Sequence, residues 1–323
     1  MLDLTVIIVS FNTRDLLLQC LDTVVDCLER AAQGGRLSLD ARAISRGYEI
    51  IVVDNASGDG SSSAVRRHYP EVRVIENEFN RGFAAANNQA IEVSQGRYLL
   101  FLNPDTQVRG NAVTDLVRFL DRYPRAGVVT CKLLNPDGSL QHSAFHFPSL
   151  WMSFFDFFPV SYRLLNSRLN GRYPLRAYRS AFEIDHPLGA CMLVRKEVIE
   201  RVGAFSEDYY MYCEEIDWCF RIKQDRWRIF CDPQAEILHL GGQSTEQLPD
   251  QMFVELFRSR LTLFRTYYNP FYRAAAKVII ALGLWWRYGR SASKYLKGEM
   301  SQERLISQRK GCLQVFSLLL HHG

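Results

Sequence analysis

Short apolar runs alternate with amphipathic stretches through the first 130 residues of the chain. The apolar runs at 4–9, 48–53, 72–76 and 98–102 predict buried strands. Helical periodicity follows at about 15–30, 83–94 and 111–123, and a polar insert at 33–46 precedes the second strand. This alternation is typical of an α/β protein with an open, mostly parallel, Rossmann-like sheet flanked by helices.

Polar side chains stand just beyond the carboxyl ends of three of the predicted strands. These residues are Ser10, Asp54 and Asp105, the last within the sequence Asn103-Pro104-Asp105. Ligands of open α/β sheets bind beyond the carboxyl ends of the strands, where all three residues fall. Asp105 could hold a divalent cation against a phosphorylated ligand, and Asp54 could accept a hydrogen bond from a pyrimidine or a ribose hydroxyl. Either carboxylate alone could equally cap a helix or close a turn.

The segment Asn80-Arg81-Gly82 opens an Ala-rich helix. Free backbone N–H groups at such a helix start would suit an anion or the edge of a base. Close packing of the alanines on the sheet would explain the same residues equally well. Neither Gly-x-Gly-x-x-Gly nor a Walker loop occurs, which argues against a dehydrogenase or a P-loop protein.

The second half of the chain is less regular. Its patterns predict strands at 190–194, 228–231 and 237–239, and helices at 197–202 and 214–223. On the acidic helix, Glu214, Asp217 and Arg221 share one face, and a carboxylate near the cleft could be the base that deprotonates a hydroxyl nucleophile. The same acids could simply match the helix dipole. A lone His such as His239 is more often structural, but it becomes a credible metal ligand if Asp105 holds a cation.

Length and cysteine usage set the broad class. With 323 residues, 47% of them hydrophobic, the chain can bury one large core or two modest ones. Its eight cysteines are scattered and form no Cys-x-x-Cys pair, which favours a reducing compartment over a disulfide framework or a structural zinc. The first residues lead directly into a strand without a basic segment, so we expect no signal peptide and a cytoplasmic protein.

Basic residues concentrate in the C-terminal part. Between Arg258 and Lys310 there are 12 Lys or Arg and only two acids, whereas the whole chain carries +4. Aromatic residues interleave with these cations on predicted helices. The most apolar piece, 274–286, is shorter than the about 20 residues that a membrane span needs. We expect this tail to lie on an anionic membrane surface, with a helical cap or an oligomer interface as the alternatives, and we expect no nucleic-acid partner.

Taken together and in this order, the polar segments resemble the family 2 inverting glycosyltransferases of the GT-A fold, especially the bacterial rhamnosyltransferase-like branch. The matching segments span about residues 4–242. They are Val9-Ser10-Phe11-Asn12, Val53-Asp54-Asn55-Ala56-Ser57, Asn80-Arg81-Gly82-Phe83-Ala84, Asn103-Pro104-Asp105, Gly189-Ala190, Glu214-Glu215-Ile216-Asp217 and His239.

The resemblance implies roles for these residues. Asp54 would read a uracil or thymine base with Ser10 nearby, and Asp105 with His239 would hold Mg²⁺ or Mn²⁺. The second acid of the Glu-Glu pair, Glu215, would be the catalytic base, with Asp217 as a competitor. The remaining expected contacts to the nucleotide sugar are Asn12, Asn55, Arg81, Gly82 and Asn103. Two positions depart from the family pattern: Asn103 replaces the first Asp of the Asp-x-Asp metal motif, and Glu215 replaces an Asp.

The resemblance also implies an architecture and a reaction. We expect a GT-A domain over 1–250, with a nucleotide-sugar half at about 1–130 and an acceptor half at 131–250, followed by a helical tail at 251–323. The reaction would be one displacement that moves a sugar, with rhamnose from dTDP-rhamnose as the first choice, to a lipid-linked saccharide or oligosaccharide at the inner face of the cell membrane. A UDP-hexose donor and a noncatalytic sensor or scaffold on the same fold are the alternatives.

Overall fold

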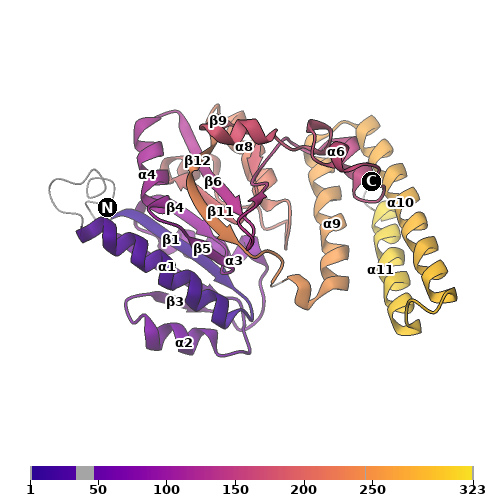
Figure 1. The fold of residues 1–323 in the computed structure, drawn as a ribbon, viewed down its shortest axis with the longest axis horizontal. Helices are drawn as coiled ribbons and strands as arrows, with labels where there is room; N and C mark the ends of the chain where they lie inside the picture. Colours follow the sequence, from indigo (N-terminus) through magenta and orange to yellow (C-terminus); the bar gives the residue numbers. More distant parts are fainter. Residues whose placement is uncertain (1, 34–46, 244, 322–323) are drawn as a thin grey trace. The chain divides into compact units, whose positions relative to one another are not determined.

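The computed structural model describes residues 2–33, 47–243 and 245–321, drawn in colour in Figure 1. The predicted polar insert at 33–46 therefore lies outside the described residues, apart from its first position. The chain forms two compact units. The first comprises Met1–Phe145, Leu175–Glu207 and Glu215–Ser244, and the second comprises His146–Pro174, Asp208–Glu214 and Thr245–Gly323.

A ten-stranded sheet forms the centre of the first unit (Figure 1). The strands follow the order β3-β2-β1-β4-β11-β6-β12-β5, with β7 paired to β6 and β9 paired to β12. Their bounds are β1 Leu2–Ser10, β2 Tyr48–Asp54, β3 Arg73–Glu76, β4 Gly96–Leu102, β5 Thr106–Val108, β6 Ala126–Leu134, β7 Leu140–Gln141, β9 Phe182–Glu183, β11 Cys191–Arg195 and β12 Arg228–His239. A separate two-stranded sheet joins β8 (Ala144–Phe145) to β10 (His186–Pro187).

The pairing confirms the prediction of a mostly parallel sheet. Strands β3, β2, β1 and β4 are parallel neighbours, and β6 is parallel to β12. Strand β11 runs antiparallel between β4 and β6. Because β1 and β2 are paired so that Ser10 stands opposite Asp54, the carboxyl ends of these strands meet at one edge of the sheet.

Helices cover both faces of this sheet. They are α1 (Arg14–Gln33), α2 (Ser61–His68), α3 (Phe83–Val93), α4 (Ala112–Arg122), α7 (Lys196–Val202) and α8 (Glu214–Gln224), with a short 3₁₀ segment at Leu175–Arg179. The side chains of Leu4, Val6 and Ile8 in β1 join one core cluster with α1 and α4. Helix α3 contacts β1 and β2 but contributes nothing to that cluster, so it lies on the opposite face. Burial on both faces explains the continuous apolar run at residues 6–9 of β1.

The main differences from the expectations lie in the second half of the sheet. Strand β6 was not predicted, although it is central to the sheet. The separate strands expected at 228–231 and 237–239 are one strand, β12, whose pairing with β6 shifts register between Asp232 and Glu236. This irregularity contains Pro233, which has no N–H for a ladder hydrogen bond, and such residues occur at bulges.

The second unit is helical. It contains α5 (Leu150–Phe155), α6 (Tyr162–Leu165), α9 (Pro249–Tyr267), α10 (Pro270–Leu296) and α11 (Gln302–His321), with 3₁₀ segments at Arg168–Asn170 and Thr245–Gln247. Helix α11 packs against both α9 and α10, and α5 packs against α10. These helices confirm the predicted C-terminal helical region, while the proposed functional division at residue 250 stays a prediction. Within the described ranges, no helix is both long enough and apolar enough to cross a membrane.

Candidate active site

The end of β2 holds the first of the predicted site residues. Asp54 is buried, and its carboxylate accepts hydrogen bonds from the Ser57 N–H at 2.9 Å and from the hydroxyl of Ser62. The Asp54 side chain therefore closes the turn that leads into α2. A carboxylate has about four lone-pair sites, so these two bonds leave Asp54 the capacity to accept a further donor.

The neighbouring loop after β1 is tied to this turn. Asn12 has a φ of 50°, accepts a hydrogen bond from the Gly58 N–H at 2.8 Å and donates its own N–H to Ser57 Oγ at 2.9 Å. Ser10, the last residue of β1, is buried, and its Oγ lies 3.0 Å from Thr13 Oγ1. Asn12 and Ser10 are thus fixed beside Asp54 by local hydrogen bonds.

Asn55 joins the same turn to the segment before α3. Its side-chain Nδ2 donates to Asn80 Oδ1 at 2.8 Å and to the Gly82 carbonyl at 3.2 Å. Its Oδ1 accepts from Asn77 Nδ2 and from the Arg81 N–H, both at 3.0 Å. The Asn55 amide is therefore used fully inside the protein, and it positions the backbone of residues 77–82.

Gly82 caps the N-terminus of α3 with a φ of 83°, a conformation that favours glycine. Its N–H is held by Asn80 Oδ1 at 2.9 Å. The Arg81 side chain is exposed, with its guanidinium 5.9 Å above the ring of Phe79. An exposed cation beside a fixed loop of this kind is available to an anionic ligand.

The segment after β4 brings Asp105 to His239. Thr106 in β5 pairs with His239 at the end of β12, and this register places Asp105 Oδ1 3.4 Å from His239 Nε2. Both side chains are 7% exposed. The separation is longer than a charge-assisted hydrogen bond, and Nε2 has no hydrogen-bond partner among the described residues.

Gln141 in β7 decides which His239 nitrogen carries the proton. The Gln141 Nε2 donates to Asn135 Oδ1 at 3.1 Å and to the His239 carbonyl at 3.3 Å, so its Oε1 faces the ring. His239 Nδ1 lies 2.6 Å from this Oε1 and must donate to it. The other ring nitrogen, Nε2, consequently faces the Asp105 carboxylate, and metal-binding histidines commonly donate their second ring N–H to a hydrogen-bond acceptor, as Nδ1 does here.

The donor set fits a divalent cation that keeps open positions. Asp105 and His239 supply one oxygen and one nitrogen, and Asn103 is partly exposed two residues before Asp105. No group of three or more His, Cys, Asp or Glu that could hold a metal occurs within the described ranges. The remaining positions of a bound Mg²⁺ or Mn²⁺ would therefore go to water or to phosphate oxygens of a ligand.

Helix α8 presents its two candidate bases in different environments. Asp217 Oδ2 accepts a hydrogen bond from Arg221 Nε at 2.9 Å, and this carboxylate is only 7% exposed. Arg221 also donates to the carbonyls of Val202 and Ala204, both at 2.8 Å. Asp217 therefore belongs to an ion pair that fastens α8 to the segment following α7.

Glu215 has no such partner for one of its oxygens. Its Oε2 is buried without a hydrogen-bond partner in the described part of the chain. Burial raises the pKa of Glu215 to about 7, although its own backbone N–H and that of Ile216 favour the charged form. A carboxyl group with a pKa near neutrality is partly ionised at physiological pH, and its carboxylate form can take up a proton.

Backbone contacts connect Glu215 to the Asp105 segment. The Asn103 N–H donates to the Ala190 carbonyl at 3.0 Å. The preceding residue, Gly189, adjoins the Glu215 side chain, since a Cβ at Gly189 would lie 3.8 Å from Glu215 Cγ. The structure thus brings Glu215, Gly189 and Asn103 into one continuous set of contacts.

Sequence reasoning missed Gln141. It stands in a two-residue strand within an aromatic, turn-rich region, and nothing in its local sequence marks it. Its contact with His239 depends on the pairing of β7 with β6, and the two residues are separated by 98 positions. Asn77, which supports Asn55, was also missed, although it directly follows the predicted strand at 72–76, as the other polar site residues follow theirs.

The chain is a glycosyltransferase with a GT-A fold, and the candidate site lies at the carboxyl edge of its α/β sheet. Residues 5–203 match Glycosyl transferase family 2, and the chain belongs to this family. It is 28% identical to the N-acetylglucosaminyl-diphospho-decaprenol L-rhamnosyltransferase of Mycobacterium tuberculosis, over 72% of this chain and 79% of that protein. It is also 28% identical to the rhamnosyltransferase WbbL of Escherichia coli, over 64% of this chain and 78% of that protein.

The fold is also found in a solved structure. The mannosyltransferase PcManGT from Pyrobaculum calidifontis, in complex with GDP-Man and Mn²⁺, superposes with a TM-score of 0.56. The match covers 99% of this chain and 87% of that one at 16% sequence identity, which shows the fold alone.

Proposed function

We propose that this glycosyltransferase moves L-rhamnose from dTDP-rhamnose to a hydroxyl group of a lipid-linked saccharide, with inversion at the anomeric carbon. The names of the relatives in Mycobacterium tuberculosis and Escherichia coli support the sugar, and the first of them supports a polyprenyl-diphosphate acceptor. The reaction would contribute to the synthesis of a cell-surface polysaccharide.

Binding of the donor would use the residues at the ends of β1 and β2. Asp54 would accept the N3–H of thymine with its unused lone pairs, close to Ser10 and Asn12. Arg81 and the N-terminus of α3 at Gly82 would face the anionic part of the donor, because both offer positive charge. Asn55 would act as a positioning residue, and Asn103 would lie near the diphosphate.

Asp105 and His239 would hold Mg²⁺ or Mn²⁺ against the diphosphate. When bound, the cation would neutralise charge on the departing nucleoside diphosphate. The chain itself contributes the orientation of the ligands: Gln141 accepts the Nδ1–H of His239 and thereby keeps Nε2 on the side of Asp105. This buried and otherwise unpartnered Nε2 is the observation that carries the proposal.

Glu215 would be the catalytic base. Its carboxylate would take the proton of the acceptor hydroxyl while that oxygen forms a bond to the anomeric carbon. The bond from the anomeric carbon to the diphosphate oxygen breaks in the same step, and its electron pair leaves with dTDP. One base is sufficient because a nucleoside diphosphate is a good leaving group, whereas a glycosidase needs two carboxyl groups.

Transfer assays with the full chain test this proposal. We expect dTDP-rhamnose and a polyprenyl-diphospho-N-acetylglucosamine to give a product of inverted configuration with Mg²⁺ or Mn²⁺, and Asp105→Ala to abolish it. Asp26→Ala removes an exposed carboxylate on α1 and should leave the rate unchanged. Turnover of a UDP-hexose in preference to dTDP-rhamnose would contradict the donor, and full activity in EDTA would contradict the metal.

We further propose that the second unit attaches the enzyme to the anionic inner face of the cell membrane. The excess of cations between Arg258 and Lys310 supports this attachment. Sedimentation with anionic vesicles at low salt, and release at high salt, are the expected results. Self-association in the absence of lipid, without vesicle binding, would favour the alternative of an oligomer interface.

A further inference from the structure

A pocket with a cationic lining lies between the C-terminal part of α9 and the N-terminal part of α10. Its volume is about 180 Å³, several times the about 30 Å³ that one water molecule occupies in the liquid. Seven residues line it, and they include three cations and no acid: Leu261, Phe264, Arg265, Pro270, Arg273, Ala274 and Lys277. The pocket therefore has space and positive charge for a small anionic group.

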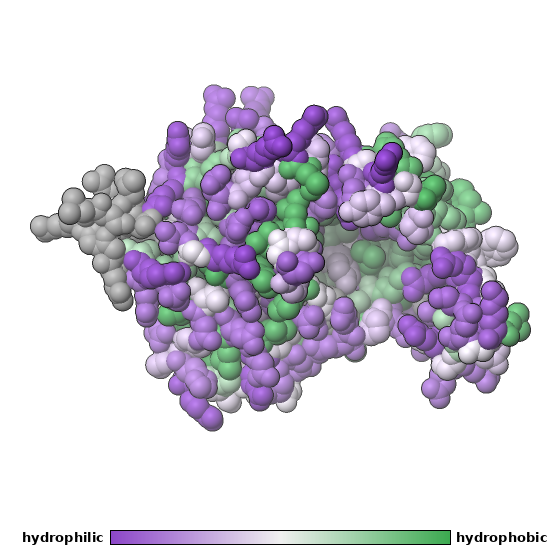
Figure 2. Space-filling model, viewed as in Figure 1, coloured by the Kyte–Doolittle hydropathy of each residue, from purple (hydrophilic) through white to green (hydrophobic). Residues whose placement is uncertain are grey.

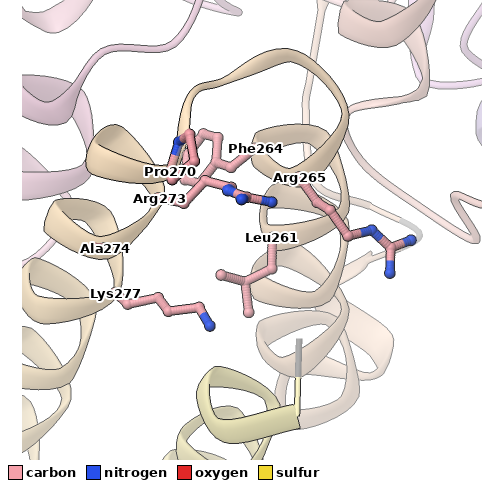
Figure 3. Close-up of a pocket in the computed structure, with 7 residues that line it drawn as sticks. All are labelled: Leu261, Phe264, Arg265, Pro270, Arg273, Ala274 and Lys277. Carbon is pink, nitrogen blue, oxygen red and sulfur yellow. The ribbon is translucent and has the colours of Figure 1, made fainter. Parts of the chain in front are cut away.

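The cations of the pocket lack internal counterions. None of Arg265, Arg273 and Lys277 forms an ion pair within the described part of the chain. Figure 3 shows that Arg273 and Lys277 extend from α10 toward α9, on either side of Leu261, whereas the guanidinium of Arg265 is directed away from them. Arg273 and Lys277 are four residues apart on one helix, so their like charges repel each other until an anion binds.

The outward face of α10 is apolar next to this pocket. Phe271, Val278, Leu282 and Trp285 are 82%, 58%, 57% and 77% exposed, and their spacing of seven, four and three residues places them on one side of the helix. We call these four residues the apolar stripe. In Figure 2 the surface over α10 accordingly carries hydrophobic (green) side chains among hydrophilic ones.

The pocket and the apolar stripe are adjacent on α10. Ala274 lines the pocket, is exposed, and lies between Lys277 and Val278 around the helix axis. The opposite side of α10, with Ala276, Ile280 and Leu284, is buried in the unit. Helix α10 has five Lys or Arg and no acid in 27 residues. Such a composition is typical of amphipathic helices that lie in the interface of an anionic bilayer.

These observations point to one occupant. We propose that the pocket binds the phosphate of an anionic phospholipid headgroup while the apolar stripe enters the acyl-chain boundary of the same membrane. Arg273 and Lys277 would bind the phosphate oxygens, with Arg265 at the rim. The inference rests on the membrane attachment proposed above and adds a defined headgroup site to it.

Vesicle binding by single-residue variants of the full chain tests the site. With vesicles of phosphatidylglycerol and phosphatidylcholine, we expect Lys277→Glu and Arg273→Glu each to weaken binding about 10- to 100-fold, because each side chain would bind the phosphate oxygens directly and a hydrogen bond between charged groups is worth about that factor. Lys277→Arg keeps the charge and should bind like the unmodified chain. The matched control is Lys297→Glu, an equal charge change at an exposed position at the end of α10, which should weaken binding less than Lys277→Glu.

A second pair of variants tests the apolar stripe. Trp285→Ser should lower the affinity for vesicles, whereas Leu313→Ser, at an exposed apolar position on α11, should not. Circular dichroism identifies any variant that fails to fold; if Lys277→Glu fails to fold, the comparison of Arg273→Glu with Lys297→Glu decides.

Three outcomes would overturn the proposal. Equal losses for Lys277→Glu and Lys297→Glu would show a diffuse charge effect. If the protein bound equally well to vesicles of pure phosphatidylcholine, the net negative charge of the headgroup would have no role in binding. Millimolar inorganic phosphate that displaces the protein from vesicles at constant ionic strength would indicate a site for soluble phosphate. Vesicle binding uses neither donor nor acceptor, so its failure leaves the proposed glycosyl transfer untouched.

Discussion

Replacing Glu215 by Gln should stabilise the protein at neutral pH and remove its activity. Gln has the shape of the neutral carboxylic acid but cannot ionise. In the native protein, burial raises the pKa of Glu215 from its ordinary 4.5 to about 7 because the charged form loses solvation. The folded state therefore disfavours the charged form that the proposed base requires.

The size and sign of the effect follow from this pKa. Below pH 4.5 the carboxyl group is neutral in both the folded and the unfolded states, and Glu215 costs no stability. Between pH 4.5 and about 7 the folded state retains a proton that the unfolded state releases, so the free energy of unfolding falls as the pH rises. At about 1.4 kcal/mol per pH unit, the total loss is roughly 3 kcal/mol, and it is constant above pH 7. Glu215→Gln should recover most of this loss at pH 8 and very little at pH 4.5.

Urea denaturation of the parent and the variant between pH 4.5 and 8 measures this difference. In parallel, the transfer rate of the parent should rise with pH to a plateau above about 7, since only the ionised carboxylate can accept the proton. Loss of a general base typically lowers the rate about 10²- to 10⁴-fold.

Asp217→Asn is the matched control on the same helix. It removes a carboxylate that is paired with Arg221, so we expect it to destabilise the protein by about 1–3 kcal/mol, the opposite sign to Glu215→Gln. If Glu215→Gln lowered stability at every pH, or if it retained the parent's activity, the inference that the buried Glu215 is the catalytic base would be refuted.

Three further predictions concern other parts of the chain. Gln141→Ala should weaken Mn²⁺ binding about 10- to 100-fold by isothermal titration, because it leaves the orientation of His239 unsupported, whereas unchanged affinity would mean that the hydrogen bond has no role. Asn55→Ala should cost about 2–4 kcal/mol in urea denaturation, since it strips partners from buried groups, and a change under 1 kcal/mol would contradict the network described. Gly283→Ala should speed hydrogen exchange in α10, because its Cβ would lie 2.2 Å from the Phe157 ring and overpacking costs about 1–3 kcal/mol. The control Gly289→Ala, with open space around it, should slow exchange because alanine has the better helix propensity. If both variants changed the exchange rate in the same direction, the clash with Phe157 would be contradicted.

The first half of the sheet could be predicted because each strand there is marked by its own residues. Strands β1, β2 and β4 each contain an apolar run of four or five residues with a polar residue directly after it, and local periodicity is enough to identify them. Strand β6 carries a glycine, Gly127, at its second position, which weakens the signal of a strand. The structure supplies the reason: a Cβ at Gly127 would lie 2.9 Å from Val198 and 3.0 Å from Trp227. Residues about 70 and 100 positions away dictate this glycine, and no local pattern reveals them.

The alternatives that the sequence left open at Asp54 are compatible in the structure. Its carboxylate closes a turn, as a capping residue would, and still has capacity for a ligand. The same holds for His239, whose Nδ1 makes a structural hydrogen bond while its Nε2 faces Asp105. A structural contact on one atom of a side chain is therefore no argument against a ligand on another, and it often supplies the orientation that a binding residue needs.

The environments of Glu215 and Asp217 on α8 distinguish their roles, which their spacing in the sequence does not. Glu215 and Asp217 stand two residues apart on one helix, so they point in different directions. The charge of Asp217 is compensated by Arg221, which is in turn bound to two backbone carbonyls, so moving a proton onto Asp217 would break an ion pair that holds α8 in place. A buried oxygen of Glu215 has no hydrogen-bond partner within the described ranges, so protonation of that carboxylate relieves a desolvation cost instead of breaking a contact. Pairs of carboxyl groups with such contrasting surroundings divide into a structural member and a proton-transferring member, and this contrast supports Glu215 as the base.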